Sequence, residues 1–189
     1  MGIEKYGFSQ NWVKIGLIDL NEFPEQEKKF LSNSDNSYEH FRYELLESYL
    51  YNKSSFSDNE IHILLDLLQF EQDITMSQTF TFQLYKSTKV TLVQKELIGT
   101  QLSKLSEWGN KIVEREKITS SLKNMTEVNQ EFFSKSVEFY IKYKDKVVIE
   151  FLIKYCNDQD QLKELLKLGL SKKLRNQLEL ILNSNKSSL

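Results

Sequence analysis

The stretch QTFTFQLYKSTKVTLV, residues 78–93, decides the fold because it fits two opposite structures. Apolar residues alternate with polar ones in both of its halves, at Phe80, Phe82 and Leu84 and again at Val90 and Leu92. A period of two is typical of strands, so this stretch alone indicates a β-hairpin over residues 79–93. However, a lone two-stranded hairpin is marginal in water, and the rest of the chain offers no third strand pattern.

The alternative is a pair of helices that meet at a turn. Asp73 suits the cap of a helix that begins with ITMSQTF, and Thr88 suits the cap of a second helix that continues into LVQKELIGTQL. The β preference of Thr, Phe and Val depends strongly on context, and the context here is helical. The sequence therefore predicts two helices, with the hairpin over 79–93 as the second interpretation.

Helical signals also precede this stretch. Ser37 stands before YEHFRYELLESYLYN, in which the apolar residues recur at the i, i+3, i+4 spacing of one buried face. Ser57 and Glu60 form an S-x-x-E capping box ahead of the apolar run IHILLDLLQF. The segment SNSDNS, residues 32–37, is rich in turn formers and predicts a loop between two helices.

The sequence of the C-terminal half predicts short helices with brief connections. Gly109 and Asn110 predict a helix end, and Thr126 predicts the start of the next helix. Asp145, Asp158 and Ser171 then lead three further helical patterns. From about residue 126, this succession resembles HEAT-type helical repeats in architecture, although no repeat consensus is present.

These patterns predict an all-α fold, either a bundle or a short solenoid-like stack of antiparallel helical hairpins. The chain of 189 residues is expected to form a single helical domain over residues 1–189. Residues 184–189 are expected to be a frayed tail.

Charge is distributed unevenly along the chain, although its formal net charge is only −2. Residues 1–76 carry 14 acidic and 6 basic side chains, whereas residues 139–189 carry 6 acidic and 10 basic ones. Only 3 of the 25 basic residues are arginines, which disfavours bidentate recognition of carboxylates or phosphates. Such polarity bears on partners rather than on the fold.

No pattern of catalytic or metal-binding residues is present. The two histidines, His40 and His62, each have a carboxylate four residues later, but no H-E-x-x-H motif occurs. Cys156, the only cysteine, lies next to acidic residues that disfavour a reactive thiolate. We expect no enzyme, no cofactor and no metal. The sequence also lacks a signal-peptide pattern and an apolar run long enough to span a bilayer, which predicts a cytoplasmic location.

The function expected from these features is protein–protein interaction as an adaptor or scaffold. The alternative is an inhibitor, such as an antitoxin or immunity protein, that covers a basic partner with its acidic N-terminal half. The acidic candidates for partner binding are Glu39, Glu44, Glu47, Asp58 and Glu60. A third interpretation, which the overall pI of about 5.8 disfavours, is weak nucleic-acid binding by the C-terminal helices. The basic candidates for that role are Lys142, Lys144, Lys146, Lys172, Lys173 and Arg175.

Overall fold

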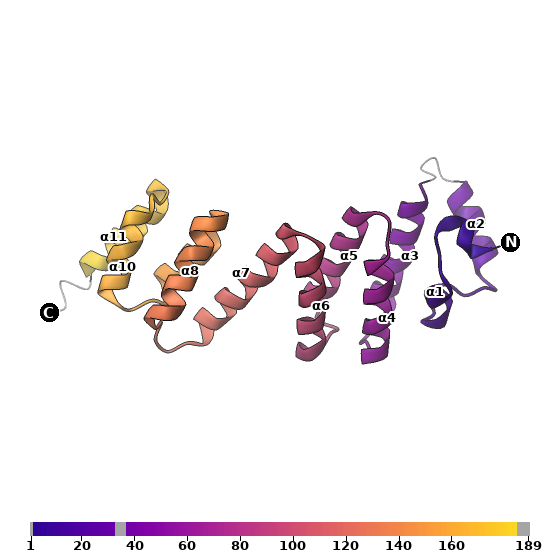
Figure 1. Cartoon of the computed structure of the whole chain (residues 1–189), viewed down its shortest axis with the longest axis horizontal. Helices are drawn as coiled ribbons and strands as arrows, with labels where there is room; N and C mark the ends of the chain where they lie inside the picture. Colours follow the sequence, from indigo (N-terminus) through magenta and orange to yellow (C-terminus); the bar gives the residue numbers. More distant parts are fainter. Residues whose placement is uncertain (1, 33–36, 185–189) are drawn as a thin grey trace. The chain divides into compact units, whose positions relative to one another are not determined.

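A computed structural model of the chain describes residues 2–32 and 37–184 (Figure 1). The described residues form helices joined by short connections and contain no β-strand, so the all-α prediction is confirmed. Most of the predicted loop over residues 32–37 and of the predicted frayed tail over 184–189 lies outside the described residues. Ser184 itself is the last residue of a helix.

The chain divides into two compact units, Met1–Asn110 and Lys111–Leu189, and the boundary falls within a helix. The expectation of a single domain over 1–189 stays a prediction. The helices of the first unit are η1 (Ile3–Tyr6), α1 (Gln10–Lys14), α2 (Phe23–Leu31), α3 (Tyr38–Asn52), α4 (Asp58–Gln69), α5 (Ile74–Lys86) and α6 (Leu92–Leu105). Those that follow are α7 (Glu107–Asn124), α8 (Gln130–Tyr143), α9 (Lys146–Tyr155), α10 (Gln159–Leu165), η2 (Leu166–Leu168) and α11 (Lys172–Ser184).

The stretch 78–93 forms the end of α5, a turn and the start of α6, which confirms the two-helix prediction and rejects the hairpin. The Asp73 side chain caps α5, as predicted, by accepting a hydrogen bond from the backbone N–H of Met76. The cap of α6 is Thr91 rather than Thr88. Thr91 and Gln94 form a reciprocal capping box, and that pattern fixes the start of the helix three residues later than predicted.

Two other predicted boundaries are wrong. Gly109 lies inside α7 rather than after a helix end, and it is the residue that lets α7 approach α6 closely. A Cβ atom at this position would lie 2.1 Å from the carbonyl oxygen of Leu102. At the other end of the α7–α8 connection, Asn129 rather than Thr126 caps α8, since its side chain accepts a hydrogen bond from the N–H of Phe132.

The first unit is a stack of helices built around large aromatic side chains. In this unit α3 packs against α5, and α4 packs against both α5 and α6. An aromatic cluster closes the N-terminal end, where the ring of Tyr6 makes edge contacts with Phe30 and Phe41, and these two rings stack at 4.5 Å. Both tryptophans belong to this unit. Trp12 is buried against Phe8, and the half-exposed Trp108 meets Phe82 edge-on.

The second unit has one continuous apolar core. Its helices pair as α8 with α9 and α10 with α11, the arrangement expected of stacked antiparallel hairpins. Val148, Ile149, Leu152 and Leu162 are fully enclosed in this core. The resemblance to HEAT-type repeats stays a prediction.

Candidate protein-binding surface

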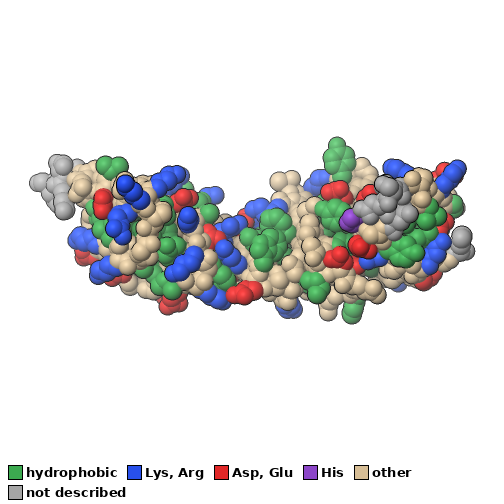
Figure 2. Space-filling model, turned by 90° about the horizontal axis from the view of Figure 1, so that it is seen from above, with side chains coloured by type: hydrophobic (Ala, Val, Ile, Leu, Met, Phe, Trp, Pro, Cys, Tyr) green, Lys and Arg blue, Asp and Glu red, His purple; other side chains and the backbone are tan. Residues whose placement is uncertain are grey.

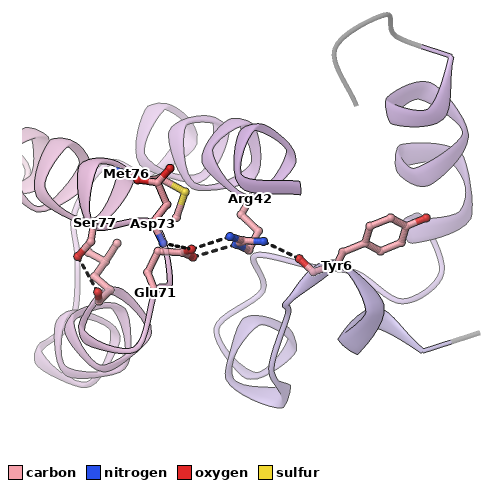
Figure 3. A network of polar contacts seen from close by, with 7 residues as sticks. Tyr6, Arg42, Glu71, Asp73, Met76 and Ser77 are labelled. Carbon is pink, nitrogen blue, oxygen red and sulfur yellow. Dashed lines mark hydrogen bonds and ion pairs between the residues drawn. The ribbon is translucent and has the colours of Figure 1, made fainter. Parts of the chain in front are cut away.

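An internal ion pair holds the start of α3 in place (Figure 3). The Arg42 guanidinium donates two hydrogen bonds to the Glu71 carboxylate, at 2.8 and 2.6 Å, and a third to the carbonyl oxygen of Tyr6, at 2.8 Å. The side chains of Arg42 and Glu71 are 9% and 5% exposed. Glu71 also accepts a hydrogen bond from the N–H of Asp73, so the pair ties α3 to the turn between α4 and α5.

Gly7 is part of this arrangement. Its φ angle of +82° lies in the left-handed region, and a Cβ atom would lie 2.9 Å from Nη1 of Arg42. A glycine here therefore permits both the backbone turn after η1 and the close approach of the guanidinium.

Because its only arginine points inward, α3 presents acidic residues to solvent without a lysine or an arginine. Glu44 and Glu47 are exposed, and Glu39 is half-buried. The neighbouring helix α5 has no charged residue from Ile74 to Tyr85, so it supplies no lysine or arginine along this length. We call Glu39, Glu44 and Glu47 the acidic face. The space-filling view shows red carboxylates gathered around the histidine side chain on this unit (Figure 2).

A shallow hollow of about 240 Å³ lies where α3 and α5 meet. Its lining combines carboxylates, hydroxyls and apolar atoms and consists of Glu39, His40, Tyr43, Asp73, Thr75, Met76 and Thr79. The hydroxyl of Tyr43 accepts a hydrogen bond of 2.6 Å from Gln83, and burial together with the charge of Glu47 raises the pKa of this tyrosine. The turn that carries Asp73 also exposes two large apolar side chains, Phe70 and Ile74.

The other two acidic candidates hold the start of α4. Glu60 completes the capping box with Ser57, forms an ion pair with Lys53 and accepts a hydrogen bond from the hydroxyl of Tyr49. Asp58 accepts a hydrogen bond of 2.7 Å from the amide of Gln94. The five predicted acidic residues thus separate into three on the acidic face and two, Asp58 and Glu60, that hold the start of α4 through hydrogen bonds within the chain.

The environment of Glu60 predicts a loss of stability in acid. Burial raises the pKa of this carboxyl, but hydrogen bonds from Lys53, Ser57 and Tyr49 outweigh it and lower the pKa from 4.5 to about 2. The ionised carboxylate stabilises the fold at every pH above the pKa that Glu60 has in the unfolded chain, about 4.5. This contribution disappears as the pH falls toward 2, the pKa in the folded protein. We expect Glu60→Gln to flatten the decline of the urea midpoint between pH 5 and 2.

The matched control is Glu44→Gln, which removes an exposed carboxylate of the same unit. This variant should keep the acid-induced decline of the wild-type protein. If the urea midpoints of Glu60→Gln and the wild type declined in parallel over this range, the hydrogen bonds at Glu60 would not be the cause.

The six predicted basic residues all lie exposed on the second unit. Lys142, Lys144 and Lys146 surround the turn between α8 and α9, and Lys172, Lys173 and Arg175 open α11. The tyrosines near these residues contact other side chains within the protein and are not free to stack on bases. Tyr140 is buried, and the Lys142 ammonium lies 4.6 Å from the ring centroid of Tyr143.

A groove of about 440 Å³ separates α7 from α8 in the second unit. Its apolar floor includes Ile118 and Phe132, and the charged lining residues are Lys117, Lys135, Lys142, Glu114 and Glu138. Since three lysines and two glutamates line the groove, their charges nearly cancel. Its charge therefore does not favour a ligand of either sign.

The potential catalytic and metal-binding residues are scattered. The thiol of Cys156 is buried, which raises its pKa, and Sγ lies 3.0 Å from the side-chain oxygen of Gln161. Within residues 2–32 and 37–184, no group of three or more His, Cys, Asp or Glu side chains is placed to hold a metal ion. In the same part of the chain, no helix combines the length and apolar character needed to cross a membrane.

Comparison with known proteins adds no further assignment. No protein-family model matches the chain, no curated protein sequence matches it, and no solved structure matches its fold. Function has to be inferred from the charge, burial and contacts of the chain's own residues.

Proposed function

We propose that the protein is a binding scaffold whose acidic face recognises a basic surface of a partner protein. The observation that carries this proposal is that α3, and α5 up to Tyr85, place no solvent-facing lysine or arginine beside Glu39, Glu44 and Glu47. The only arginine of α3, Arg42, donates its hydrogen bonds to Glu71 and to the carbonyl oxygen of Tyr6 inside the protein. A partner that brings lysines or arginines to this face supplies the missing charges.

The charge balance of the surrounding helices supports the same conclusion. Residues 38–85 contain eight acidic side chains but only two basic ones, Arg42 and Lys53. Both basic residues form ion pairs inside the unit, with Glu71 and Glu60. The remaining carboxylates create a negative field, which accelerates the encounter with a positively charged protein.

Affinity requires apolar contact as well as charge. The side chains of Phe70 and Ile74 are 79% and 62% exposed. They lie on the turn that also contributes Asp73 to the hollow. Aromatic and aliphatic side chains of this kind are typical anchors of protein interfaces. The inhibitor alternative uses the same surface and differs only in that the bound partner loses its activity.

The test compares variants that carry the same change of charge. Glu39→Gln, Glu44→Gln and Glu47→Gln are combined, which leaves the structural Asp58 and Glu60 intact. The full-length protein is immobilised, proteins of its native lysate are captured at low and moderate salt, and the association rate of each captured protein is measured. We expect the triple variant to associate about tenfold more slowly at low salt and to lose most of the salt dependence.

The control combines Glu127→Gln, Glu131→Gln and Glu164→Gln, three exposed carboxylates of the second unit. A partner specific for the acidic face binds this control like the wild type. If both triple variants slow association equally, the effect is due to net charge and the proposed surface is wrong. If no captured protein discriminates between them at any salt concentration, the proposal is also overturned.

A further inference from the structure

The turns of the second unit bring its basic residues to one side. α8 and α10 begin side by side, since the Gln161 amide donates hydrogen bonds to the carbonyl oxygen of Val128, at 3.1 Å, and to the side chain of Gln130, at 3.2 Å. Both helices then lead away from this end. Figure 1 accordingly shows the α8–α9 turn and the start of α11 on the same, upper side of this unit.

These two turns contain almost no free negative charge. Residues 139–149 include three lysines and a single acidic residue, Asp145. Asp145 is buried and already contacts Lys111, at 3.3 Å, and Arg115, at 3.5 Å. Residues 165–178 contain no acidic residue. We call the exposed basic residues of the two turns the basic edge: Lys142, Lys144, Lys146, Lys167, Lys172, Lys173 and Arg175.

The view from above looks onto this side, and it shows blue side chains spread over the C-terminal unit (Figure 2). The overall pI of about 5.8 conceals this surface because it averages two units of opposite charge. Residues 1–110 carry 16 acidic and 10 basic side chains, whereas residues 111–189 carry 11 acidic and 15 basic ones.

Helix stability does not account for the basic edge. Lys146 is the first residue of α9, and Lys172 and Lys173 are the first two residues of α11. The N-terminus of a helix carries the positive end of the macrodipole, so lysines at these positions are mildly unfavourable for the helix. The Asp145 side chain already caps α9 by accepting a hydrogen bond from the N–H of Val147, so an anionic ligand at this turn would meet the lysine side chains rather than the helix N-terminus.

We infer that the basic edge binds the phosphate backbone of a nucleic acid without sequence preference. Six of its seven residues are lysines, which neutralise phosphates as point charges, whereas base recognition usually employs the planar fork of arginine. Two separate turns provide the charges, and this arrangement suits an extended, repeating anion better than a single acidic side chain. Among the described residues of these turns, Tyr140 is buried and Tyr143 is covered by Lys142, so the bases find no exposed aromatic ring to stack on and only the phosphates are contacted.

Binding of this kind has a defined signature. Sequence-independent contacts with phosphates give dissociation constants on the order of 10⁻⁴–10⁻⁶ M at physiological salt. The logarithm of the binding constant falls linearly with the logarithm of the salt concentration, with a slope of about −0.7 for each phosphate contacted on a single strand.

The test uses the full chain and a fluorescein-labelled 20-nucleotide oligo(dT), followed by fluorescence anisotropy over a range of salt. The edge variant combines Lys146→Gln, Lys172→Gln, Lys173→Gln and Arg175→Gln, all exposed residues in the first turns of their helices. Removing positive charge there does not weaken the helices, so a loss of binding does not reflect unfolding. We expect at least a tenfold weaker affinity and a salt slope that is shallower by about 0.7 for each phosphate that is no longer neutralised.

The control combines Lys123→Gln, Lys135→Gln, Lys154→Gln and Lys163→Gln, which remove the same charge from exposed positions outside the two turns. Wild-type affinity in this control supports the basic edge. Three results overturn the inference: no anisotropy change at low salt, an equal loss in both variants, or displacement of the oligonucleotide by polyglutamate as effectively as by unlabelled oligo(dT). The last result would make an acidic protein the better partner.

Discussion

Replacing Arg42 with methionine is expected to lower the free energy of unfolding of the first unit by about 3–5 kcal/mol. The Glu71 side chain is only 5% exposed, and the substitution removes its bidentate partner. It also removes the hydrogen bond that Arg42 donates to the carbonyl oxygen of Tyr6. An uncompensated buried charge costs far more than the removal of an ion pair on the surface. Urea unfolding of the wild type and the variant at neutral pH measures the difference.

Two controls isolate the cause. The double variant Arg42→Met, Glu71→Met removes both charges and should recover much of the lost stability, because an apolar pair leaves no buried charge. Lys163→Ala removes an exposed ion pair with Asp160, and we expect little change because both side chains are solvated. If Arg42→Met were no more harmful than Lys163→Ala, the internal pair would not hold the unit together.

Replacing Phe80 with alanine is expected to cost about 3–5 kcal/mol, the range for large aromatic residues in a packed core. Phe80 is fully buried within the first unit, at 0% exposure. Its removal leaves a cavity that the surrounding helices can fill only partly, which adds to the lost transfer free energy. Thermal or urea unfolding of the full chain gives the value.

Phe82 provides the matched comparison, because it is the same residue type two positions later. In a β-hairpin, Phe80 and Phe82 would lie on the same face, and truncating either one would have a similar effect. In α5 they point to different sides, and Phe82 is only half-buried against Trp108. We therefore expect a clearly smaller loss for Phe82→Ala. Equal losses for the two variants would contradict the helical packing described for α5.

The sequence predicts most of the helices because their caps are local signals. Ser57 with Glu60, Asp73, Asp145 and Asp158 each bond to backbone N–H groups within three residues, and a local pattern is sufficient to locate them. Gly109 misleads for the opposite reason. Glycine commonly ends helices, but here it is needed because the backbone of α6 lies too close for a side chain at this position. No local sequence pattern reveals that contact.

The role of Arg42 was not predicted, although a signal is present. Arginine is rare in this chain, and Arg42 lies next to Phe41 on a helix whose apolar stripe predicts burial. A rare arginine beside a buried face suggests a buried carboxylate partner. The identity of that partner could not be predicted, because Glu71 lies 29 residues away and meets Arg42 only through the packing of α3 on the α4–α5 turn.

The candidate surface was partly predictable for a similar reason. Counting charges finds the acidic segment, but it does not distinguish Glu44, which is exposed, from Glu60, whose oxygens serve Lys53, Ser57 and Tyr49. The basic candidates share one side of the second unit only because alternate turns of stacked hairpins fall on the same side. Charge composition therefore predicts the sign of a surface, while topology determines which residues share it.

Both tryptophans lie in the first unit, so tryptophan fluorescence reports on this unit separately from the second. Trp12 is 3% exposed and Trp108 is 45% exposed, so one indole should emit at shorter wavelength than the other. Since Lys111–Leu189 contains no tryptophan, indole emission reports directly on melting within Met1–Asn110, whereas far-ultraviolet circular dichroism follows the helices of both units. Recording both signals in one denaturation experiment can resolve the melting of each unit without cutting the chain.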